Sequence, residues 1–267
     1  MNSVTVDIAA PTVGYRLAEI AIEAARLILP LWRTGLDVVS KADSSPVTAA
    51  DQRAERLILE ALARDFPAVP VVSEEDASEF GCPEEIGETF FLVDPLDGTK
   101  AFVRGDPHFT VNIGLVRQGR PVAGAVVAPP SGEVWFTSPA GAVKRHMDEG
   151  RDRAFPVRAR PWPAGDALAL ISHTMTPATL EELTLRYGFR RSEPMDSSIK
   201  LCKIAEGAAD IYPRHGPTME WDTAAGHAVL VAAGGRLTGH DGEPFVYGKA
   251  AEGFRNGWFV ARGAEPT

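Results

Sequence analysis

The sequence predicts an α+β protein, and three patterns along its 267 residues carry that prediction. Apolar side chains recur at helical spacing through residues 12–33, as on one face of an amphipathic helix. Three runs in the middle of the chain alternate or stay apolar between turns, which favours consecutive antiparallel strands at 109–116, 121–127 and 133–138. From about residue 167 onwards, strand and helix patterns alternate, as in an α/β layer.

Two helices are expected near the start of the chain. The first should end near Pro30 and Gly35, because proline and glycine are typical of helix ends. A polar, turn-rich segment, 41–51, then leads into the second helix. Within that segment Thr48 or Asp51 could simply cap the second helix, since a hydroxyl or carboxylate oxygen accepts hydrogen bonds from the first free amides.

The remaining elements follow from turn residues and spacing. Residues 77–89 are expected to form a mobile surface loop, and residues 144–166 show no clear period. The second of these segments is the candidate boundary between two domains, 1–150 and 151–267. Beyond it the expected elements are strand, helix, strand, helix, strand, helix and strand, in that order, at 167–172, 177–187, 190–194, 198–208, 210–212, 219–233 and 258–261.

Composition excludes several classes of protein. A formal net charge of -9 argues against binding long nucleic acid, which needs a basic surface, but leaves room for a small anionic ligand. No apolar run is long enough to span a membrane. Cys82 and Cys202 are too few for a disulfide framework and fit a reducing compartment. We therefore expect a cytoplasmic protein, with Cys202 in the core and Cys82 in a loop.

One stretch concentrates the chemistry. Phe90–Val93 predicts a buried strand that runs directly into Asp94-Pro95-Leu96-Asp97-Gly98-Thr99. Pro95 fixes φ between the two carboxylates, and Gly98 lets the backbone turn so that the amides of Gly98 and Thr99 can face an anion. Hard oxygen ligands beside such amides suit Mg2+ that holds a phosphate. Alone, the same residues would be typical of an ordinary Asp-Pro turn.

Two further carboxylates occupy comparable positions. Glu74 follows a short apolar strand, and Asp222 lies at the start of a helix. Each has a plain structural alternative, an exposed acidic turn for Glu74 and a helix cap for Asp222. Together with Asp94 and Asp97 they supply four oxygen donors without histidine or cysteine, which selects Mg2+ or Mn2+ over Zn2+. Two such ions roughly 3.5–4 Å apart are a known solution for hydrolysis of phosphate esters.

Three motifs resemble the signatures of the inositol monophosphatase superfamily, in the right order: Glu74-Glu75, Asp94-Pro95-Leu96-Asp97-Gly98-Thr99 and Trp221-Asp222-Thr223-Ala224-Ala225-Gly226. The segment 45–51 is similar to that family's early acidic motif, and the match extends from about Lys41 to Phe259. The resemblance implies a layered αβαβα sandwich. Within the superfamily, Ser197-Ser198-Ile199-Lys200 and Asp210–Arg214 most resemble bacterial 3′(2′),5′-bisphosphate nucleotidases. Ala101 departs from those relatives, which often have Glu there.

The resemblance also implies a role for each site residue. Glu74, Asp94 and the Leu96 carbonyl would hold one Mg2+, while Asp94, Asp97 and Asp222 would hold a second. Two or three ions are implied, with Mn2+ as a substitute. Glu74 also counts among the catalytic residues and Asp222 among the substrate contacts. Asp51 and Thr99 would polarise the attacking water, and the Gly98 and Thr99 amides would cradle the phosphate.

The nucleotide contacts implied in the same way are His173, Ser197, Lys200 and Arg214. His173 could instead be an ordinary surface histidine, and the two cations could be solvated charges. The expected activity is Mg2+-dependent removal of the 3′-phosphate of adenosine 3′,5′-bisphosphate, with sensitivity to Li+. Alternatives are an inositol, histidinol or fructose-1,6-bisphosphate phosphatase, or a non-catalytic nucleotide- or metal-binding protein. The partner is a small phosphate ester, and a homo-oligomer is possible.

Overall fold

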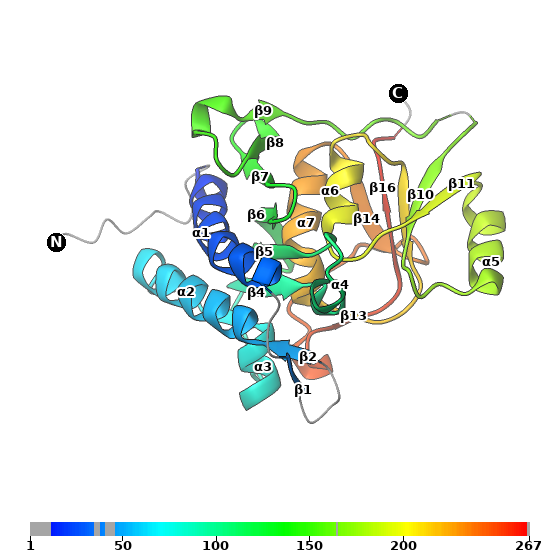
Figure 1. Ribbon diagram of the computed structural model, residues 1–267. Helices are drawn as coiled ribbons and strands as arrows, with labels where there is room; N and C mark the ends of the chain where they lie inside the picture. Colours follow the sequence, from blue (N-terminus) through cyan, green and yellow to red (C-terminus); the bar gives the residue numbers. More distant parts are fainter. Residues whose placement is uncertain (1–11, 35–37, 41–45, 164, 266–267) are drawn as a thin grey trace.

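The computed structural model describes residues 12–34, 38–40, 46–163 and 165–265. The chain forms two large sheets with a helical layer between them. Helices α6 (Ile199–Ala205) and α7 (Glu220–Ala232) make up this layer and contact both sheets. Helices α1 (Val13–Thr34) and α2 (Ala49–Asp65) cover the far face of the first sheet, and α5 (Pro177–Tyr187) lies outside the second (Figure 1). The layers are therefore helix, sheet, helix, sheet, helix, which confirms the predicted αβαβα fold of the α+β class.

The first sheet has seven strands in the order β3-β4-β5-β6-β7-β8-β9. Only the β3–β4 pair is parallel; every later neighbour is antiparallel. The three predicted central strands are confirmed, but β8 and β9 were not predicted, because β8 mixes apolar with basic residues and β9 has only two residues. The bounds are β3 (Val71–Ser73), β4 (Thr89–Asp97), β5 (Thr110–Arg117), β6 (Arg120–Ala128), β7 (Glu133–Ser138), β8 (Gly141–His146) and β9 (Phe155–Pro156).

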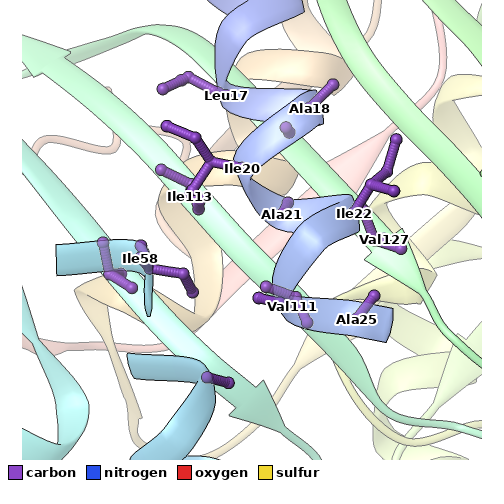
Figure 2. Packing of buried hydrophobic residues seen from close by; sticks show 14 of the residues in the cluster. Leu17, Ala18, Ile20, Ala21, Ile22, Ala25, Ile58, Val111, Ile113 and Val127 are labelled. Carbon is purple, nitrogen blue, oxygen red and sulfur yellow. The ribbon is translucent and has the colours of Figure 1, made fainter. Parts of the chain in front are cut away.

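Helix α1 buries its apolar stripe against α2 and the first sheet, as the helical spacing predicted. Figure 2 shows Ile20 and Ala21 of α1 beside Ile113 of β5, with Ile58 of α2 nearby. All four of these side chains are fully buried. The helix continues through Pro30, which is exposed four residues before the helix ends at Thr34. Proline supplies no amide donor to the helix at this position.

Several connections of the first half differ from the sequence prediction. The expected mobile loop at 77–89 is wrong in its first part, because α3 (Glu74–Phe80) continues to Phe80. Asp51 lies inside the first turn of α2 and is therefore not its N-cap, while the side chain of Thr48 and residues 41–45 fall outside the described part. A short helix, α4 (Thr99–Arg104), follows β4. Strands β1 (Val38–Ser40) and β2 (Pro46–Thr48) pair with each other.

The second sheet has five strands in the order β11-β10-β12-β16-β14. β10 is parallel to both of its neighbours, whereas β16 runs antiparallel between β12 and β14. Strand β14 was not predicted; the other strands and α5 are confirmed to within a few residues. The bounds are β10 (Leu168–Ile171), β11 (Arg191–Pro194), β12 (Ile211–Arg214), β14 (Arg236–Gly239) and β16 (Phe259–Arg262).

The smaller elements complete the chain. Strand β13 (Thr218–Met219) pairs with β15 (Arg255–Asn256), and single 3-10 turns occupy η1 (Arg151–Arg153) and η2 (Ala250–Glu252). The division into two domains at residue 150 stays a prediction; β9, beyond that point, still belongs to the first sheet. No helix in the described segments combines the length and the apolar character that crossing a membrane requires.

The backbone of α7 packs closely against two strands of the first sheet. A Cβ atom added to Gly114 of β5 would lie 2.8 Å from the amide nitrogen of Ala225, and one on Gly124 of β6 would lie 2.5 Å from the Ala225 carbonyl oxygen. Only glycine therefore allows α7 to approach the sheet this closely. Cys202 of α6 is buried beside this layer, as predicted, and Cys82 lies in the loop before β4.

Candidate active site

The end of β4 carries the predicted motif, and its pairing with β5 is irregular there. Asp94 still pairs with Asn112 of β5, but the register shifts between Asp94 and Asp97. Asp94 Oδ1 accepts a hydrogen bond from the Leu96 amide (3.0 Å), which closes a tight turn around Pro95. Next, Gly98 has a φ of +93°, and a Cβ atom there would lie 2.8 Å from the His108 carbonyl oxygen. The turn therefore requires glycine and delivers both carboxylates to one end of the sheet.

Three of the four predicted carboxylates converge. Glu74, Asp94 and Asp222 each offer an oxygen atom, and these atoms all lie within 4.8 Å of one another. Burial raises the pKa of Asp94 well above its ordinary value, and the negative charges of Glu74 and then Asp97 raise it further. The pKa of Asp222 is raised for the same reasons, burial first. Such a group of buried like charges calls for a cation, and oxygen donors alone suit a hard divalent ion.

Asp97 lies beside this group but is held from the second half of the chain. Burial raises its pKa, while the positive charge of Lys200 and a hydrogen bond from the Ser198 amide to Asp97 Oδ2 act in the opposite direction. Ser198 also donates its hydroxyl to Asn112 Oδ1 (2.7 Å), and that hydroxyl lies 2.9 Å from Thr110 Oγ1. These contacts connect β5 with the start of α6 directly behind the carboxylates.

Asp51 and Thr99 are placed differently with respect to the site. Asp51 is buried in the first turn of α2, and its charge contributes to the raised pKa of Asp94. Thr99 opens α4 and donates its hydroxyl to the Leu96 carbonyl oxygen (3.1 Å), the predicted backbone ligand. That hydroxyl has therefore used its single proton and can only accept further hydrogen bonds.

Sequence reasoning missed Glu55, which positions Glu74. Glu55 is buried in α2, one helical turn after Asp51, and its Oε1 accepts the amides of Glu75 (3.1 Å) and Asp76 (3.3 Å). It thereby satisfies free donors in the first turn of α3, the helix that begins at Glu74. The i,i+4 spacing from Asp51 was the available signal, because it places both carboxylates on one face of α2.

Asp222 has the predicted helix-capping hydrogen bond and also lies among the predicted metal ligands. Its Oδ2 accepts the Met219 amide (2.8 Å) and so caps α7, while the side chain still joins the three-carboxylate group. The neighbouring Glu220, which sequence reasoning also missed, is fully buried and accepts the amides of Gly248 (2.7 Å) and Lys249 (3.0 Å). Two carboxylates thus hold the first turn of α7: Asp222 binds the residue before the helix, and Glu220 binds the segment at 248–249.

A cavity of about 430 Å³ opens over the carboxylates. The predicted metal ligands Glu74, Asp94, Leu96, Asp97 and Asp222 line it together with the predicted contacts Gly98, Thr99, His173, Ser197 and Arg214. Lys100, Arg104 and Asp196, which were not predicted, also line it. Asp51 and Lys200 are not among its lining residues.

Lys200 and Arg214 differ in how they are held. The Lys200 side chain is 3% exposed, and its Nζ donates to the carbonyl oxygens of Met195 (2.9 Å) and Ser197 (2.8 Å). Burial lowers its pKa to about 8. Arg214 is half-buried; Nη2 donates to the Pro217 carbonyl oxygen (3.0 Å), but the buried Nε has no hydrogen-bond partner among the described residues. Arg214 therefore lines the cavity and carries one buried donor that no described residue uses.

The model of the inositol monophosphatase family matches residues 12–260. The chain belongs to this family. It is 43% identical over 213 residues to the 3′(2′),5′-bisphosphate nucleotidase CysQ of Escherichia coli (strain K12), covering 79% of this chain and 83% of that protein. It is 33% identical to the CysQ of Buchnera aphidicola, covering 92% of each.

Solved structures of related proteins have the same fold as this chain. The crystal structure of CysQ from Bacteroides thetaiotaomicron superposes with a TM-score of 0.77 at 33% identity, covering 97% of this chain and all of that one. An inositol monophosphatase from Anabaena gives a TM-score of 0.73 at 24% identity, over 95% and 91% of the two chains. The second likeness concerns the fold alone.

Proposed function

We propose that this chain is a Mg2+-dependent phosphatase that removes the 3′-phosphate of adenosine 3′,5′-bisphosphate and leaves AMP. The observation that carries the proposal is the convergence of Glu74, Asp94 and Asp222 under a cavity whose wall includes Arg214 with a free buried donor. The carboxylates suit the cations that a phosphate ester needs, and the guanidinium suits a second anion. The names of the Escherichia coli and Buchnera relatives support this choice of substrate.

The residues present fit the implied ions. Glu74, Asp94 and the Leu96 carbonyl would hold one Mg2+, and Asp94, Asp97 and Asp222 a second, with Mn2+ as a substitute and a third ion possible during turnover. When bound, the ions orient the phosphoryl group, lower the pKa of water and offset charge on the leaving oxygen. The carboxylates are pre-arranged for that charge, because burial and then mutual repulsion raise their pKa values, and a bound cation would stabilise their ionised forms.

Thr99 and Asp51 would orient the attacking water. Because Thr99 Oγ1 donates its proton to the Leu96 carbonyl, the only hydrogen bond it can form with a water is as acceptor. A water that donates one proton to Thr99 and the other to the Asp51 carboxylate has its lone pairs directed away from both. This arrangement would aim the nucleophile at the phosphorus and give its proton a carboxylate acceptor.

The chain's own donors would bind the rest of the substrate. The amides of Gly98 and Thr99, in the turn that the positive φ of Gly98 creates, would cradle the reacting phosphate. Arg214 would meet the 5′-phosphate, which is not cleaved. Ser197, a non-glycine residue with φ of +57°, and His173 line the same cavity and would contact the nucleoside.

A panel of phosphate esters tests the proposal. Phosphate release is measured with Mg2+ and with EDTA for adenosine 3′,5′-bisphosphate, AMP, inositol 1-phosphate, histidinol phosphate and fructose 1,6-bisphosphate. We expect the highest kcat/KM for adenosine 3′,5′-bisphosphate, no release from AMP, and loss of activity in EDTA. Equal kcat/KM for inositol 1-phosphate would overturn the substrate assignment. Tight nucleotide binding without phosphate release from any ester would instead indicate a binding protein.

A further inference from the structure

A second group of potential metal ligands lies at the rim of the active-site cavity. Asp106 and His108 belong to the segment between α4 and β5, and His173 follows β10 in the second half of the chain. Their ligand atoms all lie within 4.8 Å of one another. His173 lines the cavity described above, so this second group borders the proposed active site without sharing a residue with its carboxylates.

The nearest pair of ligand atoms already has the spacing that an ion needs. His108 Nδ1 is 3.0 Å from Asp106 Oδ1, yet this buried nitrogen makes no hydrogen bond of ordinary geometry with the described residues. Two ligands on a tetrahedral Zn2+, at 2.0–2.1 Å from the ion, lie about 3.3 Å apart. The pair therefore needs little rearrangement to share an ion. The His173 ring lies 6.5 Å from that of His108, centroid to centroid.

Local structure holds Asp106 and His108 together. Asp106 Oδ1 accepts the backbone amide of His108 (3.0 Å), and Pro107 between them restricts the turn. The same oxygen retains a lone pair for a metal ion, because a carboxylate oxygen accepts more than one bond. Gly105, with φ of +75°, ends α4 and starts this turn. The site is thus partly organised before any ion arrives.

The surrounding charges tolerate a divalent cation. Arg104 is the nearest cation, with Nη2 3.9 Å from Asp106 Oδ2, but the same atom lies 2.8 Å from Asp196 Oδ2. The guanidinium is therefore paired more closely with Asp196 than with Asp106. Two carboxylates and one guanidinium leave a local balance of minus one when both histidines are neutral. A dication would be attracted by that balance rather than repelled.

The donor set selects a different metal from the carboxylate group. Two imidazoles with one carboxylate are typical of Zn2+ and of other late first-row metals, whereas Mg2+ prefers oxygen alone. Three protein ligands also leave one tetrahedral position for water or for a substrate atom. The two groups of ligands can therefore be occupied by different ions in the same molecule.

We propose that Asp106, His108 and His173 form a Zn2+-binding site that restricts access to the active-site cavity. An ion bound there would tie His173 to the Asp106–His108 turn. A tied His173 is withdrawn from the nucleoside that it would otherwise contact, so substrate binding weakens while the chemistry at the carboxylates is unchanged. The metal site itself stands apart from the proposed nucleotidase activity; only its effect on KM depends on that activity.

Metal binding is tested first, without any turnover. The parent protein for these measurements is the Asp94→Asn variant, because this change weakens the carboxylate site. The probe is Co2+, whose visible absorption reports imidazole ligands. Zn2+ is then used to displace it. We expect one equivalent of Co2+ with a histidine-type spectrum, and at least about a tenfold loss of affinity in His108→Ala and in His173→Ala. Thermal melts establish that each variant is folded.

A matched control separates this site from adventitious histidine binding. His146 also has a nearby aspartate, with Nδ1 3.7 Å from Asp148 Oδ2, but belongs to neither three-ligand group found among the described residues. His146→Ala should leave the Co2+ spectrum and the Zn2+ affinity unchanged. Equal Co2+ and Zn2+ binding by His108→Ala, His173→Ala and the parent would overturn the proposed site, whatever the enzyme's substrate proves to be.

Kinetics then test the consequence. In the wild type with saturating Mg2+, Zn2+ should raise KM for the preferred ester several-fold and leave kcat nearly unchanged. His108→Ala removes a side chain that has no proposed contact with the substrate, so this variant should lose the rise in KM, and His146→Ala should keep it. Zn2+ that displaces Mg2+ from the carboxylates would instead lower kcat equally in all three proteins. If only that common effect appears, the restriction of access is wrong.

Discussion

The backbone amide of Ser198 donates a hydrogen bond to Asp97 Oδ2 across 101 positions of sequence. This bond joins the turn after β4 to the start of α6, so one candidate metal ligand is oriented by the opposite half of the chain. Lys200 completes the arrangement, because its Nζ donates to the carbonyl oxygens of Met195 and Ser197 in the segment that carries Ser198. Lys200 therefore acts on the site chiefly through the backbone that it holds.

Replacing Lys200 by Ala should consequently damage the site as a whole. The change leaves two carbonyl groups without their donor and removes a buried side chain, at a cost of about 1–3 kcal/mol in the free energy of unfolding. We expect kcat/KM to fall by similar factors for adenosine 3′,5′-bisphosphate and for inositol 1-phosphate. Urea denaturation and parallel kinetics on the two esters measure both effects. A loss confined to the bisphosphate would show that the third donor of Lys200 binds the second phosphate.

Arg214→Ala should behave differently, since Arg214 lines the cavity and has an unpartnered Nε. Losing a charged hydrogen bond to a ligand typically costs a factor of about ten to a hundred. We expect that loss in kcat/KM for adenosine 3′,5′-bisphosphate, and only a few-fold change for inositol 1-phosphate. Arg214→Lys serves as the control, because it keeps the charge without the planar fork and should recover part of the loss. Equal losses on both esters would refute the assignment.

Asp94→Asn tests the carboxylate group directly. Asp94 is expected to bridge the ions, so activity should fall about a hundredfold or more. Its charge is also buried among like charges, so without metal the variant should be as stable as the wild type or more stable. The wild type should gain about 2.7 kcal/mol at Mg2+ a hundredfold above its Kd, and the variant much less. Thermal melts with Mg2+ and with EDTA measure this; an equal gain in both proteins would exclude Asp94 as a ligand.

Much of this site was predictable because local chemistry determines it. The run from Phe90 to Val93 followed by Asp94, Pro95 and Asp97 specifies a buried strand that ends in carboxylates, and β4 has this form. The start of α7 at Glu220, with Asp222 in its first turn, was predictable for a similar reason. These features depend on a few consecutive residues, so the sequence alone contains them.

Other features depend on contacts between distant segments, which no local pattern encodes. Glu55 acquires its function only when α2 packs beside α3, and Lys200 looks like an ordinary helix cation until the fold buries it. Strand β8 was missed because its Lys144 and Arg145 interrupt the apolar run. In the structure Lys144 forms ion pairs with Glu133 and Glu206. Arg145 forms an ion pair with Glu19.

A further prediction concerns Asp51 and Thr99, the two residues proposed to orient the attacking water. Asp51→Asn and Thr99→Val should each lower kcat much more than they raise KM, because orientation of a nucleophile matters mainly in the transition state. The double variant should lose less than the product of the two single losses, since both side chains would serve one water. Steady-state kinetics on all four proteins form the required cycle. Strictly multiplicative losses would mean that the two residues act in separate steps.

The last prediction concerns acid stability and His227, which lies on α7 five positions after Asp222. His227 is buried, its Nδ1 lies 3.0 Å from the Tyr247 hydroxyl, and that hydroxyl donates to Thr223 (3.3 Å). Burial lowers the pKa of His227 to about 4 from the ordinary 6.5. The unfolded chain therefore takes up a proton near pH 6.5, whereas the folded protein resists it until about pH 4.

The sign follows from which state binds the proton. Between those two pH values the unfolded state holds more protons, so stability falls as the pH is lowered, by an amount on the order of 3 kcal/mol in total. The full contribution is present above pH 6.5, and no further loss from His227 occurs below about pH 4. Since the carboxylates near Asp94 also have raised pKa values and so contribute to the pH dependence of stability, the effect of His227 has to be isolated by comparison with a variant.

His227→Gln is that variant, because an amide keeps hydrogen-bonding capacity toward Tyr247 and does not titrate. It should be less stable than the wild type at pH 7, owing to imperfect packing, and should lose less stability on acidification. The two curves of unfolding free energy against pH should therefore converge as the pH approaches 4. Urea denaturation in EDTA at intervals from pH 7 to pH 4 measures this convergence. Parallel curves would mean that His227 is protonated equally in the folded and unfolded states, and that its burial on α7 has no energetic consequence for acid unfolding.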